Sequence, residues 1–134
     1  MDPRMYILMR TDLASMNPGK GMAQSHHAAM VFAQDMWNKL KSGDKMPKGL
    51  AEWQSEAGEQ GFGTTITLDV RDEETMLRLV DTALAFGYQA NVVLDDTYPV
   101  SDGKVTHLLP VYTCAYVFSP DGSPWFLSTL DLHP

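Results

Sequence analysis

Cysteine and positive charge are scarce in this chain. Its 134 residues include one cysteine, Cys114, which permits no internal disulfide and cannot form a Cys-rich zinc site. We therefore expect a reducing compartment, the cytoplasm. Ten Lys and Arg residues stand against 17 Asp and Glu residues, a formal net charge of −7 at pH 7. That sign excludes a protein that coats nucleic acid, although it leaves room for a local contact with a polyanion.

Long hydrophobic runs are also missing. The N-terminal apolar run, residues 5–9, is bounded by Arg4 and Arg10 and is far shorter than the roughly 20 residues that span a bilayer. We expect neither a membrane partner nor a targeting segment. With 44% hydrophobic and 20% charged residues, the chain can still bury a core, and its length fits a single domain over residues 1–134.

The few basic residues are unevenly distributed. Seven of them, against four acidic residues, fall within residues 1–50. One interpretation is a positive patch on an acidic body, which would hold a polyanion locally. The other is that these are solvated charges at helix ends. The sequence leaves both open.

The hydrophobic pattern predicts an α/β fold. Strands are expected at residues 6–9, 64–70, 89–94 and 112–118, with a shorter one at 105–109. Helices are expected at 22–42 and 73–86, with a short helical segment at 49–57. Residues 15–21 and 95–99 are expected to form turns, and the tail after Pro120 to be irregular. We predict a mixed, mostly parallel sheet of four to five strands with helices packed on both faces.

The first of these helices is expected to bury one apolar stripe, because its apolar positions recur at steps of three and four. The stripe comprises Met22, His26, Ala29, Met30, Ala33, Met36, Trp37 and Leu40.

The loop before that helix is the first candidate site. Gly19 and Gly21 would leave backbone N–H groups open at a helix start, where the helix dipole favours anions, and Lys20 adds a full positive charge. This predicts an oxyanion or anion site, with Arg10 as a further contact. The spacing is not that of a phosphate-binding P-loop. The alternative is that the segment is only a turn.

The second candidate site follows the third strand. Asp95 or Asp96 there has the chemistry of a general base, and Thr97 stands beside them. Adjacent Asp and Thr residues are equally common in turns and helix caps. The sequence does not decide between the two interpretations.

The histidines and the cysteine carry weaker signals of a functional site than the two segments above. His26 and His27 are adjacent on a helix and point about 100° apart, so they cannot jointly hold one ion. No metal and no cofactor are expected. We interpret His26 as a core residue, His27 as the better functional candidate at the edge of the stripe, and Cys114 as a structural thiol in an apolar strand.

Five segments of the chain form a recognisable pattern: residues 5–13 (MYILMRTDL), 19–24 (GKGMAQ), 27–29 (HAA), 73–74 (EE) and 113–115 (TCA). Together they resemble the peptidyl-tRNA hydrolase type 2 family. In that family, a strand ending in Arg-x-Asp-Leu leads through a turn rich in Gly and Lys into a helix bearing Ala-Gln-x-x-His-Ala. The likeness spans about residues 4–119, and the pattern is closest to shortened bacterial or phage-type members.

The resemblance implies a metal-independent reaction: hydrolysis of the ester that joins a peptide to the 3′ end of tRNA. In that scheme Lys20 and neighbouring N–H groups stabilise the oxyanion, and Asp95 or Asp96 activates the water. Thr97 and Thr113 bind the acceptor end of the tRNA, and His27 supports the lysine or the substrate. The only partner implied is peptidyl-tRNA, and a homodimer is left open.

Three departures from the family leave alternatives open. The family usually has two lysines in its Gly-Lys-Gly-Lys turn, and Lys20 aligns with either. The family's Asp-Ala-Gly-x-Thr turn is replaced here by residues 95–99 (DDTYP). Thr106 and Thr113 both fit the last threonine position, and we prefer Thr113 because Cys114 follows it. Two further hypotheses are a catalytically idle member that binds tRNA ends or a protein, and hydrolysis of a different ester or amide.

Overall fold

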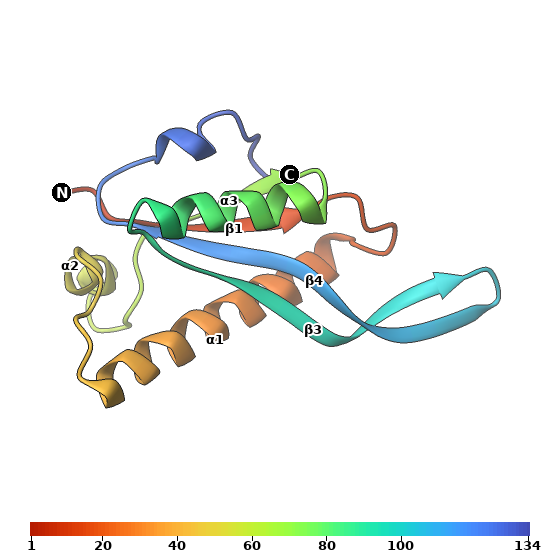
Figure 1. Cartoon of the computed structure of the whole chain (residues 1–134), viewed down its shortest axis with the longest axis horizontal. Helices are drawn as coiled ribbons and strands as arrows, with labels where there is room; N and C mark the ends of the chain where they lie inside the picture. The colour runs from red at the N-terminus through yellow and green to blue at the C-terminus, as the bar shows by residue number, and fades with distance from the viewer.

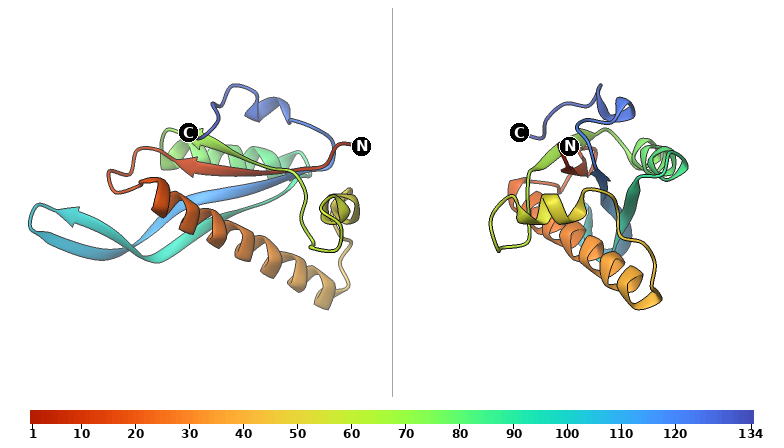
Figure 2. Two further views of the ribbon diagram at one scale, coloured as in Figure 1. Left: turned by 180° about the vertical axis from the view of Figure 1, so that it is seen from behind. Right: turned by 90° about the vertical axis from the view of Figure 1, so that its left-hand side faces the viewer.

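A twisted four-stranded sheet lies between two helical layers (Figures 1 and 2). The computed structural model describes all 134 residues. The strand order is β2-β1-β4-β3. In chain order the elements are β1 (Arg4–Arg10), α1 (Pro18–Ser42), α2 (Leu50–Ser55), β2 (Thr65–Val70), α3 (Glu73–Ala85), β3 (Gln89–Asp102), β4 (Val105–Ser119) and the 3₁₀ helix η1 (Trp125–Leu127).

The sheet is mixed, as predicted. β1 and β2 pair in parallel, whereas β4 is antiparallel to both of its neighbours, β1 and β3. Three of the four strands therefore point the same way. Only one neighbouring pair is parallel, because β4 lies between β1 and β3. The α/β class, the antiparallel last strands and the helices on both faces are confirmed.

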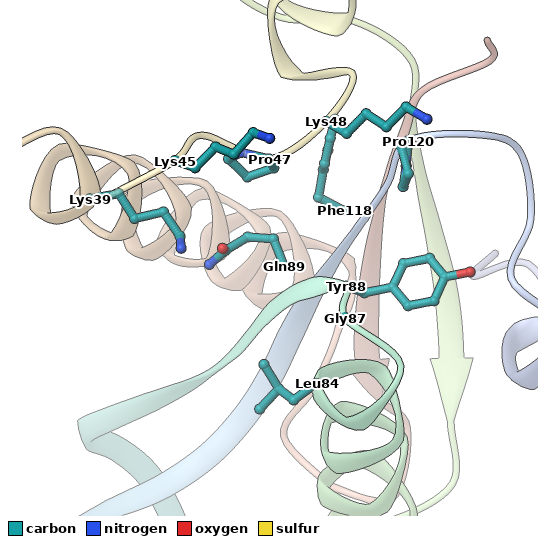
Figure 3. Close-up of a pocket in the computed structure, with 10 residues that line it drawn as sticks. All are labelled: Lys39, Lys45, Pro47, Lys48, Leu84, Gly87, Tyr88, Gln89, Phe118 and Pro120. Carbon is teal, nitrogen blue, oxygen red and sulfur yellow. The ribbon is translucent and has the colours of Figure 1, made fainter. Parts of the chain in front are cut away.

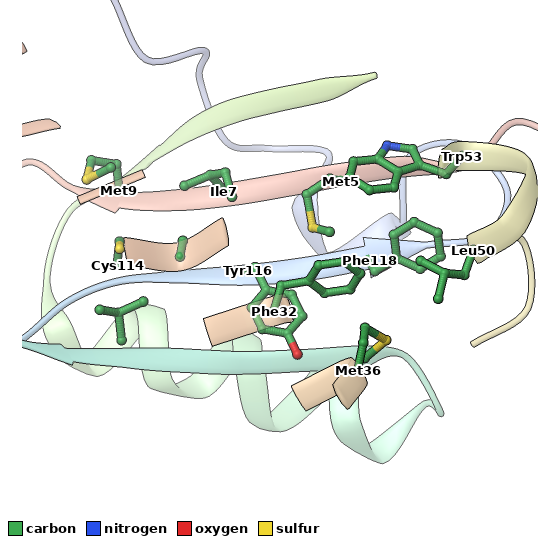
Figure 4. Packing of buried hydrophobic residues seen from close by; sticks show 12 residues of the cluster. Met5, Ile7, Met9, Phe32, Met36, Leu50, Trp53, Cys114, Tyr116 and Phe118 are labelled. Carbon is green, nitrogen blue, oxygen red and sulfur yellow. The ribbon is translucent and has the colours of Figure 1, made fainter. Parts of the chain in front are cut away.

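Alternation along β1 divides the core into two layers. Met5, Ile7 and Met9 pack under α1 and α2, and the residues between them pack toward α3 and η1, because successive strand residues point to opposite faces. In the first layer Phe32 of α1 lies edge-on to Tyr116, with ring centroids 5.2 Å apart (Figure 4). The predicted segment around α2 is confirmed, since it buries its leucine and its tryptophan in this layer.

Helix α1 begins earlier than predicted. The side chain of Asn17 accepts a hydrogen bond from the backbone N–H of Lys20 at 2.9 Å and caps the helix, and Pro18 takes the first helical position, where a missing N–H costs nothing. Gly43 ends the helix in a left-handed conformation with φ 74°. The predicted loop at residues 18–21 is thus the first turn of α1.

The buried face of α1 is not the predicted stripe. It comprises Gly21, Gln24, Ala28, Phe32 and Met36. Of the predicted stripe only Met36 is buried, and its large members are exposed, from 55% for Trp37 to 71% for Met22. The interpretation of His26 as a core residue was wrong for the same reason, since His26 is exposed. The helix carries two stripes, and the more hydrophobic one faces outward.

Strands β3 and β4 form a two-stranded arm that projects past the start of α1 (Figure 1). The turn predicted at residues 95–99 was wrong: β3 continues through it, with irregular pairing between Val93 and Leu94 and between Asp95 and Tyr98. The strands predicted at 105–109 and 112–118 are one strand, β4. A two-residue hairpin joins β3 to β4, and Gly103 at its first position has φ 61°, as a type II′ turn requires.

The C-terminal tail is more ordered than predicted. After η1, the chain returns along β2, where Leu68 bridges Leu132 and the backbone N–H of His133 donates to Thr67. This contact covers the free edge of β2. None of the helices combines the length and the apolar character needed to cross a membrane.

Candidate active site

Gln24 joins three elements at the start of the arm. Its side chain is buried in the first turns of α1. Nε2 donates to Oδ2 of Asp95 in β3 at 2.8 Å, and Oε1 accepts from the hydroxyl of Thr113 in β4 at 2.5 Å. Because an amide is both donor and acceptor, this arrangement satisfies both partners and fixes the orientation of the amide. One buried side chain therefore positions a carboxylate and a threonine.

The structure separates the two adjacent aspartates. Asp95 also accepts a bond from the backbone N–H of Thr97 at 3.1 Å, within the irregular stretch of β3. The side chain of Asp96 is exposed and has neither a hydrogen-bond nor an ion-pair partner. Thr113 and Thr106 separate in the same way, since Thr113 is completely buried beside Gln24 and Thr106 lies exposed in the arm.

Lys20 lies one helical turn before Gln24. Its ammonium sits 5.7 Å from the centre of the Tyr98 ring, within the range of a cation–π contact. Tyr98 is almost completely buried, and its hydroxyl lies 3.0 Å from that of Ser15. No carboxylate forms an ion pair with Lys20, so its charge is not neutralised. The positive end of α1 adds to it.

The open backbone donors predicted at this helix start are not all present. Asn17 accepts from the N–H of Lys20 with its side chain and from the N–H of Gly21 with its carbonyl, the latter at 2.8 Å. Gly21 is buried under the helix, and Gly19 is exposed in the first turn. The predicted anion site therefore depends on the lysine and on the helix dipole more than on free N–H groups.

Arg10 lies away from Lys20. It is buried on the α3 side of the sheet, pairs with both carboxylate oxygens of Asp12 at 2.9 and 2.8 Å and donates to the carbonyl of Tyr112. The hydrogen bond with Asp12 raises the pKa of Arg10, and the same bond lowers the pKa of Asp12. Arg10 thus ties the end of β1 to β4, and each of its three side-chain nitrogens already donates one hydrogen bond.

His27 is also outside the cluster. It is exposed, and seven residues of helix, about 10 Å along the axis, separate it from Lys20. Its ring lies 6.1 Å from that of His26 at a tilt of 59°. No group of three or more His, Cys, Asp or Glu side chains is arranged to hold a metal ion.

Cys114 packs against the backbone of Gln24. Its Sγ lies 3.3 Å from the carbonyl oxygen of Gln24. Burial raises the pKa of Cys114 to about 12, so the group is a neutral thiol at physiological pH and a poor nucleophile. This agrees with its interpretation as a structural thiol.

Sequence reasoning missed two members of this cluster. Gln24 was quoted in the motif but not assigned a role, although its position one turn after Lys20 puts both on one side of α1. Tyr98 was placed in a turn, and no local signal placed its ring under the lysine. Its position depends on how β3 pairs with β4.

A comparison with protein-family models identifies the family to which the chain belongs. The family model described as peptidyl-tRNA hydrolase PTH2 matches residues 3–111. The chain belongs to this family. The matched span includes Lys20, Gln24 and Asp95, whereas Thr113 lies just beyond it. No curated protein matches the chain. Membership in the PTH2 family implies peptidyl-tRNA hydrolase activity with peptidyl-tRNA as the substrate.

Proposed function

We propose that this PTH2 protein hydrolyses the ester between a peptide, or an N-blocked amino acid, and the 3′ end of tRNA at the cluster around Gln24. The observation that carries the proposal is that Gln24 holds Asp95 and Thr113 one helical turn from the unpaired Lys20. The likeness to shortened bacterial or phage-type members and a cytoplasmic location stay predictions.

Asp95 is the proposed general base. Its two hydrogen bonds, from Gln24 and from the N–H of Thr97, hold the carboxylate in one orientation while lone pairs remain to accept a proton. A water that donates to this carboxylate attacks the ester carbonyl carbon, and its proton passes to Asp95. The ester C–O bond then breaks, and the ribose oxygen leaves with that proton.

Lys20 is the proposed electrostatic partner. Negative charge develops on the carbonyl oxygen during attack, and an ammonium near that oxygen stabilises it by about 3 kcal/mol, the value typical of one such donor. The Tyr98 ring restricts where the ammonium lies. Gly19, exposed in the same turn, leaves space for the substrate to approach.

The threonines take different roles in this proposal. Thr97 is exposed beside Asp95, where its side chain is free to contact the acceptor end. Thr113 is a positioning residue, because its buried hydroxyl is engaged with Gln24. Neither Arg10 nor His27 is assigned a contact with the reacting atoms.

We propose that the reaction needs no metal, because a carboxylate base and an ammonium supply both the proton transfer and the charge stabilisation. The experiment measures release of an N-acetylated amino acid from tRNA with and without EDTA, for the wild type and for Lys20→Ala. We expect EDTA to change nothing and Lys20→Ala to lower kcat about 100-fold. Comparable rates would remove Lys20 from the mechanism. A wild type that binds tRNA but never cleaves the ester would favour an idle member.

We also propose that the protein pairs with a second copy along the outward stripe of α1. The stripe is self-complementary, because an antiparallel two-fold arrangement sets Met22 opposite Leu40 and His26 opposite Trp37. Each exposed Trp37 would then face an apolar cavity of about 340 Å³ lined in part by His26 and Ala29 of the other copy.

A further inference from the structure

The free positive charge of the molecule resides on its lysines. Each of the four arginines lies within 4.0 Å of a carboxylate, in the pairs Arg4–Asp2, Arg10–Asp12, Arg71–Asp72 and Arg78–Glu74. None of the six lysines forms an ion pair. Four of the six occur within residues 39–48, at the end of α1 and just after it. An anion that approaches this acidic protein therefore finds unneutralised charge mainly at this end.

Three of these lysines line one cavity. Lys39, Lys45 and Lys48 surround a cavity of about 360 Å³ whose wall includes Gln89 and Phe118, and no acidic residue lines it (Figure 3). The ends of Lys39 and Lys45 lie on the Gln89 side, and the end of Lys48 lies toward the opposite side. We call this cavity the lysine pocket. Its chemistry suits a phosphate, which is small, anionic and accepts hydrogen bonds from several ammonium groups.

The lysine pocket lies at the far end of the molecule from the proposed active site. Along α1, Lys20 and Lys39 are 19 residues apart, about 28 Å at the helical rise. Along β3, Gln89 and Asp95 are six residues apart, about 20 Å. A small substrate cannot reach both places. A single ligand that does so is an extended polyanion.

We propose that the lysine pocket binds a backbone phosphate of the tRNA while the ester of the same tRNA lies at Lys20. This inference rests on the proposed function. Two carboxylates restrict where the phosphate sits: Asp35 and Asp44 line a separate hollow that adjoins the pocket at Lys39. Asp35 is held by the hydroxyl of Tyr116 at 2.6 Å, so it does not turn to neutralise the lysines.

The test removes two charges from the pocket and two from elsewhere. The pocket variant is Lys45→Gln with Lys48→Gln. The control is Lys41→Gln with Lys104→Gln, which has the same net charge but leaves every pocket residue unchanged. All four lysines are exposed, so both variants should keep the wild-type unfolding temperature. Binding is measured by fluorescence anisotropy of labelled uncharged tRNA over a salt series. Hydrolysis is measured with the same N-acetyl-aminoacyl ester on full-length tRNA and on a short oligonucleotide.

We expect the pocket variant to raise Kd and KM for full-length tRNA about 10-fold and to reduce the slope of log K against log salt by about 1, as loss of one phosphate contact does. Its kcat and its KM for the oligonucleotide should not change. The control should change Kd less than 3-fold. If both variants weaken tRNA binding equally, or if KM also rises for the oligonucleotide, the proposal that the lysine pocket binds a tRNA phosphate is overturned.

The outcomes also separate this inference from the proposed function. If the wild type cleaves the ester but its tRNA affinity does not depend on Lys45 and Lys48, the proposed hydrolysis stands and phosphate binding at the lysine pocket is wrong. If the wild type binds tRNA through Lys45 and Lys48 but cleaves nothing, phosphate binding stands and the proposed hydrolysis is wrong. A wild type that does not bind tRNA rejects both.

Discussion

At the scale of single residues, the uncharged Gln24 organises the site. Gln24→Leu removes the donor to Asp95 and the acceptor for Thr113 and leaves the buried hydroxyl with only the weak sulfur acceptor of Cys114, which costs about 1–3 kcal/mol. We expect a free energy of unfolding lower by that amount and a kcat at least 10-fold lower. Urea unfolding and single-turnover rates measure the two effects. Gln34→Leu, on the exposed side of the same helix, is the matched control.

Gln24→Glu distinguishes positioning from simple stability. The hydroxyl of Thr113 keeps an acceptor, but a second carboxylate now lies against Asp95. The carboxylate of Asp95 then loses the N–H donor that orients it and meets a like charge instead, so kcat should fall at least 10-fold while the fold is retained. A variant that folds normally and keeps the wild-type kcat would contradict the role of Asp95 as the base held by Gln24.

The pair formed by Arg10 and Asp12 gives stability a pH dependence. The hydrogen bond from Arg10 lowers the pKa of Asp12 below its ordinary value of 3.8. The stabilisation is therefore fully present above pH 4 and is lost as pH falls through the lowered pKa. Asp12→Asn should reduce the free energy of unfolding at pH 7 and flatten its fall between pH 4 and 2. Urea unfolding at several pH values tests this, with Asp96→Asn as the unpaired control. An equal acid slope in Asp12→Asn and wild type would rule the pair out.

The sequence predicted the types of side chain needed for ester hydrolysis, including Lys20 and the two aspartates. The choice of Asp95 over Asp96 was not predicted, because adjacent strand residues face opposite sides and the irregular pairing of β3 decides which one faces Gln24. Tertiary pairing of this kind leaves no mark in the local sequence.

At the scale of elements, the cap of α1 connects stability to the site. Asn17 accepts the N–H of Lys20 and so fixes the first turn. Asn17→Ala should lower the free energy of unfolding by about 1 kcal/mol, whereas Asn17→Asp, which retains an acceptor, should not. Thermal or urea unfolding measures the difference. Equal loss in both variants would show that the side-chain cap does not hold the turn.

The outward stripe of α1 predicts self-association. Trp37 is 55% exposed on the helix, so Trp37→Glu should not unfold the protein but should place a charge opposite His26 within the proposed two-fold contact. We expect a dimer for the wild type and a monomer for the variant by sedimentation velocity. Asn38→Glu, one residue along and off the stripe, is the control. A wild type that stays monomeric at high micromolar concentration would contradict the pairing.

The same helix shows why element prediction succeeded only in part. Periodicity identified a long helix and its C-terminal stop at Gly43 correctly. It assigned the wrong buried face, because the inward stripe includes Gly21, Gln24 and Ala28 and is less hydrophobic than the outward one. Residues 95–99 were predicted as a turn because Asp and Pro are common in turns, whereas pairing with β4 keeps β3 extended there.

At the scale of the whole molecule, charge sets the size of the tRNA contact. The arginines are paired with carboxylates, and the formal net charge is −7. Lys20 and the lysine pocket, at opposite ends of α1, offer few phosphate contacts. Affinity for tRNA should therefore fall with salt along a shallow slope, about −2 to −3 in log K against log salt. The sequence left open whether the basic residues of the first 50 positions form a positive patch or are solvated charges at helix ends. The salt slope and the lysine-pocket variants test the first of these interpretations.

The two adjacent aspartates give the most direct test of the proposed hydrolysis. Single-turnover release of an N-acetylated amino acid from tRNA is measured for the wild type, Asp95→Asn and Asp96→Asn, which remove the same charge one residue apart. We expect cleavage by the wild type, a loss of about 100-fold to 10,000-fold in Asp95→Asn, as removal of a general base causes, and a rate within about 3-fold of wild type in Asp96→Asn. An inactive wild type, or equal rates in the two variants, would contradict it.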